Sequence, residues 1–430
     1  MRRRGWCASH PNSVLACYRR QDAHVPSEPL TVNQHRAAVA DLVGAQPPVT
    51  YQLADCRGLV LAADVAAPVS LPPFDNAAMD GYAVRSVDIA EASAEHPVEL
   101  PVAEDIPAGR TDVVPLLPGT AHRIMTGAPL PPGADTIVQV ELTDAGEHRV
   151  RVLGSVPPGK HLRRTGEDVV AGATVLTDGT VLGPAQLGLA AAVGLPSLTV
   201  YRPPNVLVLS TGSELVGPGE PLRPGQIYES NSVMLATALR EIGCRVEELR
   251  FVPDDVAAFH AALEPRISEV DLLVTSGGVS AGAYEVVKDA LSGQGVEFTR
   301  VAVQPGGPQG CGRYRGVPVV TLPGNPVSSL ISVELYLRPA LLAAMGHRVV
   351  DRRKVRATLT SELDSPTGKE QYRRGVYRPR FGEVSGEVGP SGGPGSHLLA
   401  SFAAANCLIV IDAETAHLPE GAEVDVLLFD

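Results

Sequence analysis

The stretch Asp271–Lys288, DLLVTSGGVSAGAYEVVK, decides the fold that this sequence predicts. An apolar run, Leu272–Val274, is followed by Ser276-Gly277-Gly278 and then by a polar segment compatible with a helix. The pattern indicates a buried strand that ends in a loop with little side-chain bulk. In an open α/β sheet a ligand binds at such loops, and paired glycines let backbone N–H groups approach a phosphate. A tight strand-to-helix turn is the alternative explanation of one Gly-Gly pair.

The same alternation of strand, loop and helix continues from Tyr201 to Met345. It predicts a doubly wound, mostly parallel sheet with right-handed crossovers. Because the loops that follow parallel strands lie at one edge of a sheet, we expect five of them to converge on one site. These loops, rich in glycine, acids and hydroxyls, are Thr211–Glu214, Pro253–Asp255, Ser276–Gly278, Gln304–Pro308 and Pro323–Ser329.

The segments on either side of the α/β pattern have the character of β structure. Residues 98–153 contain short apolar runs separated by Pro-Gly turns, which is typical of a small β-rich module. After Gly346, alternating apolar residues predict a small β barrel or sandwich. The chain as a whole is therefore expected to be a multidomain α/β protein. The strands of its last part are expected at Lys354–Leu359, Gln371–Arg378, Asn406–Ile411 and Glu423–Phe429.

Composition limits the classes of partner and compartment. The chain has 430 residues, enough for three or four domains, and a formal net charge of −12, which disfavours nucleic acid and anionic membranes as partners. The six cysteines form no C-x-x-C pair and no H-E-x-x-H occurs, so neither a disulfide framework nor a transition-metal cage is predicted. No apolar run approaches the roughly 18 residues of a membrane span, and the N-terminus lacks the pattern of a signal peptide. We therefore expect a cytoplasmic protein.

Acids and hydroxyls stand at the predicted edge of the sheet. Glu214, Asp254 and Asp255 follow neighbouring strands, and carboxylates beside phosphate-binding loops suggest Mg²⁺ shared with a phosphorylated ligand. Ordinary capping of the following helices is the alternative for these acids. Ser328 lies where a helix begins, so its hydroxyl and the nearby amides can receive an oxyanion, with simple N-capping as the alternative. Asp80, in an Asp-Gly turn, is weak evidence by itself.

Six motifs, in this order along the chain, carry a family resemblance. They are Asp75–Ala83 (DNAAMDGYA), Ile124–Ala128 (IMTGA), Arg164–Asp168 (RTGED), Ser210–Glu214 (STGSE), Ser276–Ser280 (SGGVS) and Pro323–Ser328 (PGNPVS). In these motifs the chain resembles the molybdopterin molybdenumtransferases, which insert molybdate during molybdenum-cofactor biosynthesis and to which the E domain of gephyrin is related. The resemblance covers the chain from about Thr31 to its C-terminus.

The resemblance implies a reaction and a quaternary structure. The family takes adenylylated molybdopterin and molybdate with a divalent cation, here expected to be Mg²⁺, and releases AMP and molybdenum cofactor. It implies a homodimer whose site is shared between subunits, and a transient contact with the molybdopterin adenylyltransferase. The expected parts are a disordered extension at 1–30, a discontinuous N-terminal or linker domain at 31–73 and 152–200, the β-rich module at 74–151, the α/β molybdopterin-binding domain at 201–347 and the C-terminal β barrel at 348–430.

Matching positions in the motifs assign roles to particular residues. Asp80 and Thr126, from the β-rich module, are expected to face the sheet of the other subunit. The catalytic group implied is Asp80, Thr126, Glu214, Asp254 and Asp255, with the last three also as metal ligands. The cofactor-binding group implied is Thr211, Gly212, Ser213, Ser276, Gly277, Gly278, Ser280, Pro323, Gly324, Asn325, Ser328, Lys369 and Arg374.

The chain departs from the family pattern in charged positions of the site. The usual S-V-G-D-Y-D-x-V-K has Ala283 and Glu285 in place of its two aspartates. The usual K-P-G-K-P has Gln304 and Gly307 in place of its two lysines, and Lys369 stands where arginine is usual. A lysine lacks the bidentate grip of arginine, whereas losing opposite charges together costs less than losing one partner.

These departures leave two main hypotheses. The first is an active molybdenumtransferase with altered site electrostatics, for molybdate or tungstate. The second is a catalytically reduced paralogue that binds molybdopterin or molybdenum cofactor without turnover. The flanking modules argue against a nucleotidyl-transfer role on molybdopterin, and a scaffold role like that of gephyrin has no positive support in the sequence.

Overall fold

The structure, a computed structural model, describes residues 28–252, 255–278, 286–380, 382 and 385–429. The chain divides into two compact units. The first unit comprises Met1–Val49, Gly58–Val60 and Tyr201–Asp430, and the second comprises Thr50–Arg57 and Leu61–Val200. The predicted disordered extension lies outside the described residues as far as residue 27, and the predicted five-part division stays a prediction.

The first unit is built around a six-stranded sheet in the order β15-β12-β16-β20-β19-β17. The first four strands are parallel to one another. Because β19 is antiparallel to both β20 and β17, β17 runs in the same direction as the first four. The predicted mostly parallel sheet is therefore confirmed. The strands are β12 (Asn205–Thr211), β15 (Arg245–Val252), β16 (Leu272–Ser276), β17 (Val296–Arg300), β19 (Pro308–Tyr314) and β20 (Val317–Leu322).

Strand β19 was not predicted from the sequence. Its residues include Pro308, Gly310 and Gly312, which are types that disfavour strands. A Cβ at Gly310 would lie 2.4 Å from Thr321 Oγ1, and one at Gly312 would lie 2.1 Å from Gly295 O. The glycines are therefore needed because neighbouring strands approach too closely for a side chain.

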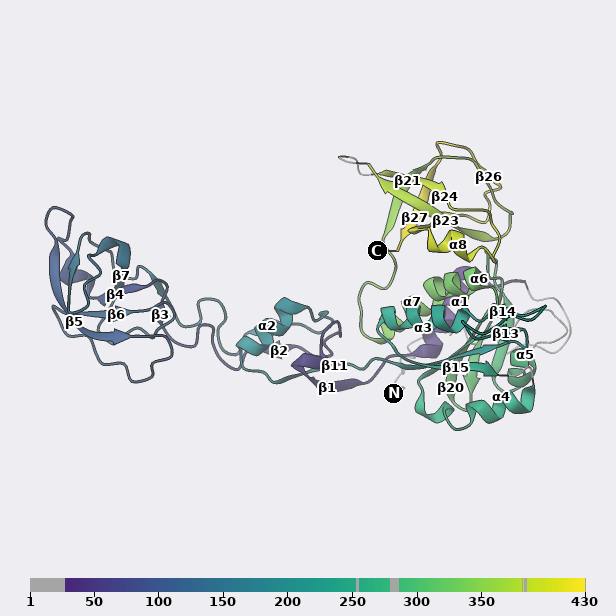
Figure 1. The fold of residues 1–430 in the computed structure, drawn as a ribbon, viewed down its shortest axis with the longest axis horizontal. Coiled ribbons are helices and arrows are strands. Elements are labelled where there is room, and N and C mark those ends of the chain that lie inside the picture. The colour runs from purple at the N-terminus through teal and green to yellow at the C-terminus, as the bar shows by residue number, and fades with distance from the viewer. Residues whose placement is uncertain (1–27, 253–254, 279–285, 381, 383–384, 430) are drawn as a thin grey trace, which may run out of the picture. The chain divides into compact units, whose positions relative to one another are not determined.

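Helices cover both faces of this sheet, as Figure 1 shows. Along β12, Val206 and Val208 pack in one core with α1, α3, α6 and α7, whereas Leu207 and Leu209 pack in a second core with α4 and α5. The alternation of side chains along a strand places successive apolar residues on opposite faces, so a nearly continuous apolar run fills both cores. The helices are α1 (Val32–Val43), α3 (Asn231–Ile242), α4 (Val256–Leu263), α5 (Val286–Leu291), α6 (Pro326–Ser332) and α7 (Arg338–Ala344).

Helices α6 and α7 form one continuous helix, Pro326–Ala344, joined by a π-helical segment, Val333–Leu337. Pro339 has no N–H to donate and lies two residues after the end of the π-helical segment. Among the described residues, this helix of 19 residues has the length and apolarity of a membrane span, but 78% of it is buried inside the fold. It therefore occupies the position of a core helix.

A closed five-stranded barrel forms the end of the first unit. Its strands pair in the ring β23-β24-β21-β27-β25, closed by the pairing of β25 with β23. The predicted small barrel is confirmed. Strand β18 (Val303–Gln304) adds to the edge of β23, so the barrel is joined to a loop of the α/β sheet. The elements are β21 (Lys354–Leu359), β22 (Leu363–Asp364), β23 (Glu370–Pro379), β24 (Gly386–Pro390), α8 (Leu399–Ala403), β25 (Cys407–Ile411), β26 (His417–Leu418) and β27 (Glu423–Leu428).

The second unit contains the β-rich module, a five-stranded sheet in the order β7-β4-β6-β5-β8. Tyr82 and Val138 lie in a core on one face of this sheet, whereas their neighbours Ala83 and Ile137 lie in a second core, as alternation along the strands places them on the opposite face. The strands are β4 (Gly81–Val84), β5 (Val98–Ile106), β6 (Ala121–Ile124), β7 (Thr136–Gln139) and β8 (Arg149–Val152).

The remaining elements, from both units, are short. They are β1 (Pro48–Gln52), β2 (Val65–Ala66), β3 (Asn76–Ala77), β9 (Leu162–Arg163), β10 (Thr174–Leu176), α2 (Pro184–Ala192), β11 (Ser197–Tyr201), β13 (Leu215–Val216) and β14 (Ile227–Tyr228), with 3₁₀ turns at Leu53–Asp55, Ser86–Ile89, Val140–Leu142 and Ile267–Glu269.

Candidate functional site

A cavity of about 1130 Å³ lies at the carboxyl edge of the α/β sheet. Four of the five loops expected to converge there line it, and Asp255, the described residue of the fifth, does not. The barrel also contributes, through Gly368 and Lys369 and through Pro394–His397. The predicted site residues that line the cavity are Thr211, Gly212, Glu214, Ser276, Gly277, Gly278, Pro323, Gly324, Asn325, Ser328 and Lys369. Of the others, Ser213, Asp255 and Arg374 do not line it, Asp80 and Thr126 belong to the other unit, and Asp254 and Ser280 lie outside the described residues.

The glycine loops of the cavity pack backbone against backbone. Gly277 has φ +91°, and a Cβ there would lie 3.0 Å from Thr211 O. A Cβ at Gly324 would lie 3.3 Å from the Cα of Gly277. The N–H of Gly277 donates to Leu322 O at 3.2 Å, so this amide is used inside the fold. Gly278, whose N–H has no hydrogen-bond partner among the described residues, is the amide of the pair that remains for a ligand.

Asn231, at the start of α3, joins two of these loops and was not predicted as a site residue. Its Nδ2 donates to Ser276 Oγ at 2.7 Å and to Gly324 O at 2.6 Å. Both acceptors line the cavity, as does Asn231 itself. One amide group at the start of α3 therefore fixes the end of β16 to the turn after β20, although the two loops are far apart in the sequence.

Ser328, near the start of α6, has the properties of an oxyanion ligand. The residue is 3% exposed, and neither its N–H nor its hydroxyl has a hydrogen-bond partner among the described residues. The neighbouring Ser329 supports the turn instead, because its hydroxyl donates to Pro323 O and, at 3.2 Å, to Asn325 O. The N–H groups at the start of a helix favour an anion. Simple N-capping, the alternative for this motif, is not observed, because the N-cap residue Asn325 makes no side-chain cap hydrogen bond, and Ser328 remains available.

The loop Gln304–Pro308 is held by contacts from three directions. Val301 N donates to Gly307 O at 2.7 Å, which closes the loop on its own base. The Nε2 of buried Gln309 donates to Gly306 O and to Ser332 Oγ, both at 2.7 Å. On the barrel side, Glu370 N donates to Ala302 O at 3.0 Å. The loop therefore presents a defined surface to the cavity although it carries neither of the lysines that the family pattern has.

Arg374 supports a loop that lines the cavity. Its Nη1 donates to Gly395 O at 3.1 Å and its Nη2 donates to Gly393 O. Burial, with a smaller effect of Arg373, lowers the pKa of this guanidinium. In this structure Arg374 positions the segment that carries Ser396 and His397, two lining residues that the sequence reasoning missed. Direct binding of an anion by Arg374 stays a prediction.

The three acids expected to bind a metal have different surroundings. Glu214 lines the cavity, is exposed, and has no side-chain partner among the described residues. Asp255 instead caps α4, accepting from Ala258 N at 2.8 Å, which is the alternative weighed for these acids. Across the described residues there is no group of three or more His, Cys, Asp or Glu that could hold a metal ion. A three-carboxylate site therefore stays a prediction.

In the second unit, Asp80 and Thr126 lie together. Both the backbone N–H and the hydroxyl of Thr126 donate to Asp80 Oδ1 at 2.7 Å. These hydrogen bonds, the one from the hydroxyl first, lower the pKa of Asp80. Both residues are exposed, so Asp80 presents an ionised carboxylate on the surface of the β-rich module. The sequence motifs that carry them are thus two halves of one local structure.

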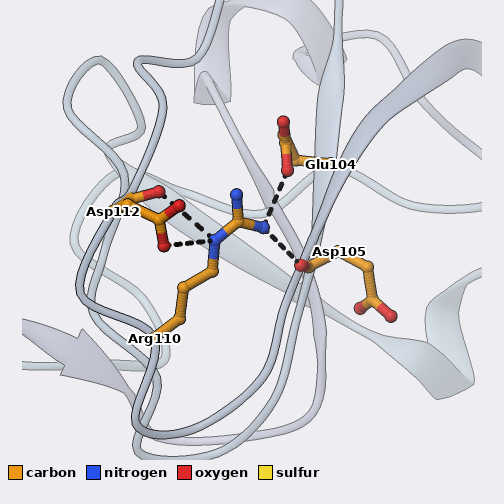
Figure 2. A network of polar contacts seen from close by, with 4 residues as sticks. All are labelled: Glu104, Asp105, Arg110 and Asp112. Carbon is orange, nitrogen blue, oxygen red and sulfur yellow. Dashed lines mark hydrogen bonds and ion pairs between the residues drawn. The ribbon is translucent and has the colours of Figure 1, made fainter.

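Arg110 stabilises the loop beside this pair. Met125, next to Thr126, donates from its N–H to Ile106 O at 3.1 Å, and the loop that follows Ile106 contains Arg110. Figure 2 shows the guanidinium of Arg110 between Glu104, Asp105 and Asp112. Its Nη1 donates to Glu104 Oε2 at 2.8 Å and to Asp105 O at 2.9 Å. The loop is therefore tied back to β5.

Asp75 connects the first motif to the third. Its Oδ1 accepts from the N–H of Thr165 at 2.8 Å, and its Oδ2 accepts from Arg164 Nη1 at 2.6 Å. The hydrogen bond from the Thr165 N–H, followed by that from Arg164, lowers the pKa of Asp75. These two motifs therefore support each other structurally.

Comparisons with known proteins cover nearly the whole chain. Residues 30–194 match the MoeA N-terminal region (domain I and II), residues 207–343 match a probable molybdopterin binding domain, and residues 356–429 match the MoeA C-terminal region (domain IV). The chain is 53% identical to molybdopterin molybdenumtransferase 2 of Mycobacterium tuberculosis, over 92% of this chain and 98% of that protein. It is 34% identical to the molybdopterin molybdenumtransferase of Haemophilus influenzae, over 93% and 99%. A crystal structure of the molybdopterin biosynthesis MoeA protein from Pyrococcus horikoshii is similar at 31% identity with a TM-score of 0.79, covering 94% of this chain and 100% of that one.

Proposed function

The chain belongs to the molybdopterin molybdenumtransferase family and is therefore a transferase of molybdenum-cofactor biosynthesis; we propose that it inserts molybdate into adenylylated molybdopterin and releases AMP and molybdenum cofactor. The observation that carries the proposal is the unpartnered N–H and hydroxyl of Ser328 in a cavity lined by glycine loops. Such donors suit the tetrahedral oxyanions that this reaction handles.

The chain's own groups can divide the work of binding. Gly278 offers a backbone N–H to a phosphate, and Gly277 permits the close approach because no side chain stands there. Ser328 and Lys369 are donors for a second oxyanion, molybdate in this proposal. Asn231 keeps the two glycine loops in register, so that both oxyanions can be held at once. Holding the reactants at fixed separation lowers the entropic part of the barrier.

Glu214 is the described carboxylate that fits Mg²⁺ at this cavity. Mg²⁺ in proteins commonly takes one or two carboxylates and completes its shell with water and substrate phosphate. An exposed, unpartnered carboxylate beside a phosphate loop meets that requirement without a three-residue cage. When bound, the ion would neutralise charge on the phosphate from which AMP leaves. Asp254, outside the described residues, and Asp255 are proposed as further contacts.

The proposal includes a homodimer in which Asp80 and Thr126 complete the site of the other subunit. Its support is that these two residues form an ionised, exposed pair on a module that has its own core. A cytoplasmic location and transient contact with the adenylyltransferase that supplies the substrate belong to the same proposal.

The proposal is tested by supplying pure protein with adenylylated molybdopterin, Mg²⁺ and molybdate and following AMP release. AMP release that depends on molybdate is the expected result. The Glu214→Gln variant is expected to lose the Mg²⁺ dependence, whereas Glu220→Gln, an exposed acid outside the cavity, is the matched control. Unchanged turnover by Glu214→Gln would remove Glu214 from the metal site.

A second candidate function is binding without turnover, and it is favoured by the missing lysines at Gln304 and Gly307. In that case the pure protein binds molybdopterin or molybdenum cofactor with a defined stoichiometry but releases no AMP when molybdate is added. The same assay, read together with an equilibrium binding measurement, separates the two functions.

A further inference from the structure

Besides Lys369, the cavity is lined by a second cationic residue, Arg300, to which no motif assigned a role. The described residues that line the cavity include two carboxylates, Glu214 and Glu229, and two permanent cations, Arg300 and Lys369. Glu229 is 1% exposed, and both of its oxygens accept hydrogen bonds from Ser232. The guanidinium of Arg300, by contrast, has no hydrogen bond or ion pair with any described residue, although the residue lines the cavity.

The backbone around Arg300 is firmly held. Arg300 ends β17, and its carbonyl accepts from Leu30 N at 2.8 Å. The next residue, Val301, donates to Gly307 O at 2.7 Å. This hydrogen bond folds the loop back, so that Arg300 is one residue from the point where Gly307 meets the base of the loop. The backbone from which the Arg300 side chain extends is therefore held in place next to the loop that contains Gln304 and Gly307, the two positions at which the family pattern has lysines.

We propose that Arg300 supplies the cationic oxyanion contact that Gln304 and Gly307 cannot make, and that it binds a tetrahedral oxyanion of the ligand in this cavity. The proposal rests on the proposed function and deepens it. The oxyanion is a phosphate of the pterin substrate or molybdate, two sources with the same chemistry. A guanidinium suits either one, because its planar array of donors can bind two oxygens at once and keeps its charge at all physiological pH values.

The backbone geometry at Gly307 allows the positive charge of Arg300 to be replaced experimentally by that of a lysine at position 307. A Cβ at Gly307 would meet Val301 O at 3.4 Å, an ordinary van der Waals contact, and its φ is outside the left-handed region. Gly306 differs, because it has φ +102° and a Cβ there would lie 3.3 Å from Ser332 Oγ. A lysine is therefore tolerated at position 307, next to the site that Arg300 occupies in the folded loop.

The test compares Arg300→Gln, Arg300→Lys and the double variant Arg300→Gln/Gly307→Lys in the full-length chain. Arg315→Gln is the control for net charge, because Arg315 lies in the turn between β19 and β20, at the opposite edge of the sheet, and pairs there with Glu264. Dissociation constants are measured by calorimetry for adenylylated molybdopterin without molybdate and for molybdate alone. Loss of affinity in the first titration identifies the phosphate as the oxyanion, and loss in the second identifies molybdate.

The expected result is about tenfold weaker binding for Arg300→Gln in one of the two titrations, the size of a lost charge-assisted hydrogen bond. The double variant is expected to stay within about threefold of the unmodified protein, and Arg300→Lys, which keeps the charge but not the planar array of donors, is expected to lose less affinity than Arg300→Gln. Affinities of Arg300→Gln equal to those of Arg315→Gln overturn the proposal, and so does a loss for Arg300→Lys as large as that for Arg300→Gln. Because binding is measured without turnover, absence of AMP release would refute the proposed reaction and leave this inference standing.

Discussion

Replacing His35 by phenylalanine is expected to remove much of the acid sensitivity of the first unit. His35 lies on α1 with 0% exposure, and both ring nitrogens lack a hydrogen-bond partner among the described residues. Its ring packs edge-on against Tyr336, with centroids 4.7 Å apart and an angle of 87° between the planes. Phenylalanine can keep this aromatic contact, and it removes two polar atoms that are costly to bury without partners.

The magnitude follows from the pKa of the imidazole. Burial lowers the pKa of His35 from 6.5 to about 4. The folded protein therefore keeps His35 neutral while the unfolded chain takes up a proton as the pH falls below about 6.5, so stability is lost on acidification. The loss begins near the unfolded pKa and is complete below the folded one. It amounts to about 2 kcal/mol at pH 5 and about 3 kcal/mol in full, from 1.36 kcal/mol per unit of pKa.

Urea unfolding followed by circular dichroism at 222 nm tests this prediction at pH 8 and pH 5. The first unit contains seven of the eight α-helices found in the described residues, so the helical signal reports mainly on that unit. The drop in unfolding free energy between the two pH values should be about 2 kcal/mol smaller for His35→Phe than for the unmodified protein. The exposed His96→Phe is the control and should behave as the unmodified protein does. An equal drop in His35→Phe and the unmodified protein would refute the reasoning.

Three further predictions concern the site and the second unit. Asn231→Ala removes two hydrogen bonds between loops, so it should lower the free energy of urea unfolding by about 2 kcal/mol. Thr237→Ala, on the same helix, is the control and should change this free energy little. Equal effects of the two substitutions would contradict the role of the Asn231 amide. Gly277→Ala should lower the unfolding free energy by about 1–3 kcal/mol, because position 277 has a positive φ and a Cβ there would crowd Thr211 O. Gly307→Ala should lower it by less than about 0.5 kcal/mol. A larger loss for Gly307→Ala than for Gly277→Ala would disprove the steric argument. Because its pKa is lowered in the folded protein, Asp75 contributes stability above about pH 4, and this contribution is lost as the pH falls through the folded pKa. Asp75→Asn should therefore flatten the change in the urea-unfolding midpoint between pH 6 and pH 3. An unaltered dependence of the midpoint on pH would contradict this prediction.

Much of the fold could be predicted because local patterns decide it. The run Leu272–Val274 is fully buried as expected, and Gly243 ends α3 in a left-handed conformation, as a glycine after a helix predicts. Strand β19 was missed because its glycines are required by contacts with neighbouring strands, which a local pattern does not record. The capping function of Asp255 was one of two alternatives, and only the contact with Ala258 distinguished them.

The candidate site shows the same division between local and distant information. The glycine loops and Ser328 were predicted as site residues, since strand direction and family motifs point to them and the structure places them at one cavity. Asn231 was not predicted, because its importance lies in hydrogen bonds to residues 45 and 93 positions away. The role of Arg374 in supporting the loop at 393–395 likewise depends on chain segments that meet only after folding.

The sequence by itself determined the alternation of strands, loops and helices in the α/β part apart from β19, the motifs of the family and the absence of both usual lysines from Gln304–Pro308. Only the tertiary structure decided which groups at the sheet edge are committed and which remain for a ligand. The carboxylates of Glu229 and Asp255 are used within the fold, whereas the hydroxyl of Ser328 and the guanidinium of Arg300 have no partner among the described residues. The physical reason is that a hydrogen bond or a buried contact depends on two groups and not on one. Folding brings such groups together from segments whose separation along the chain does not indicate their distance in space.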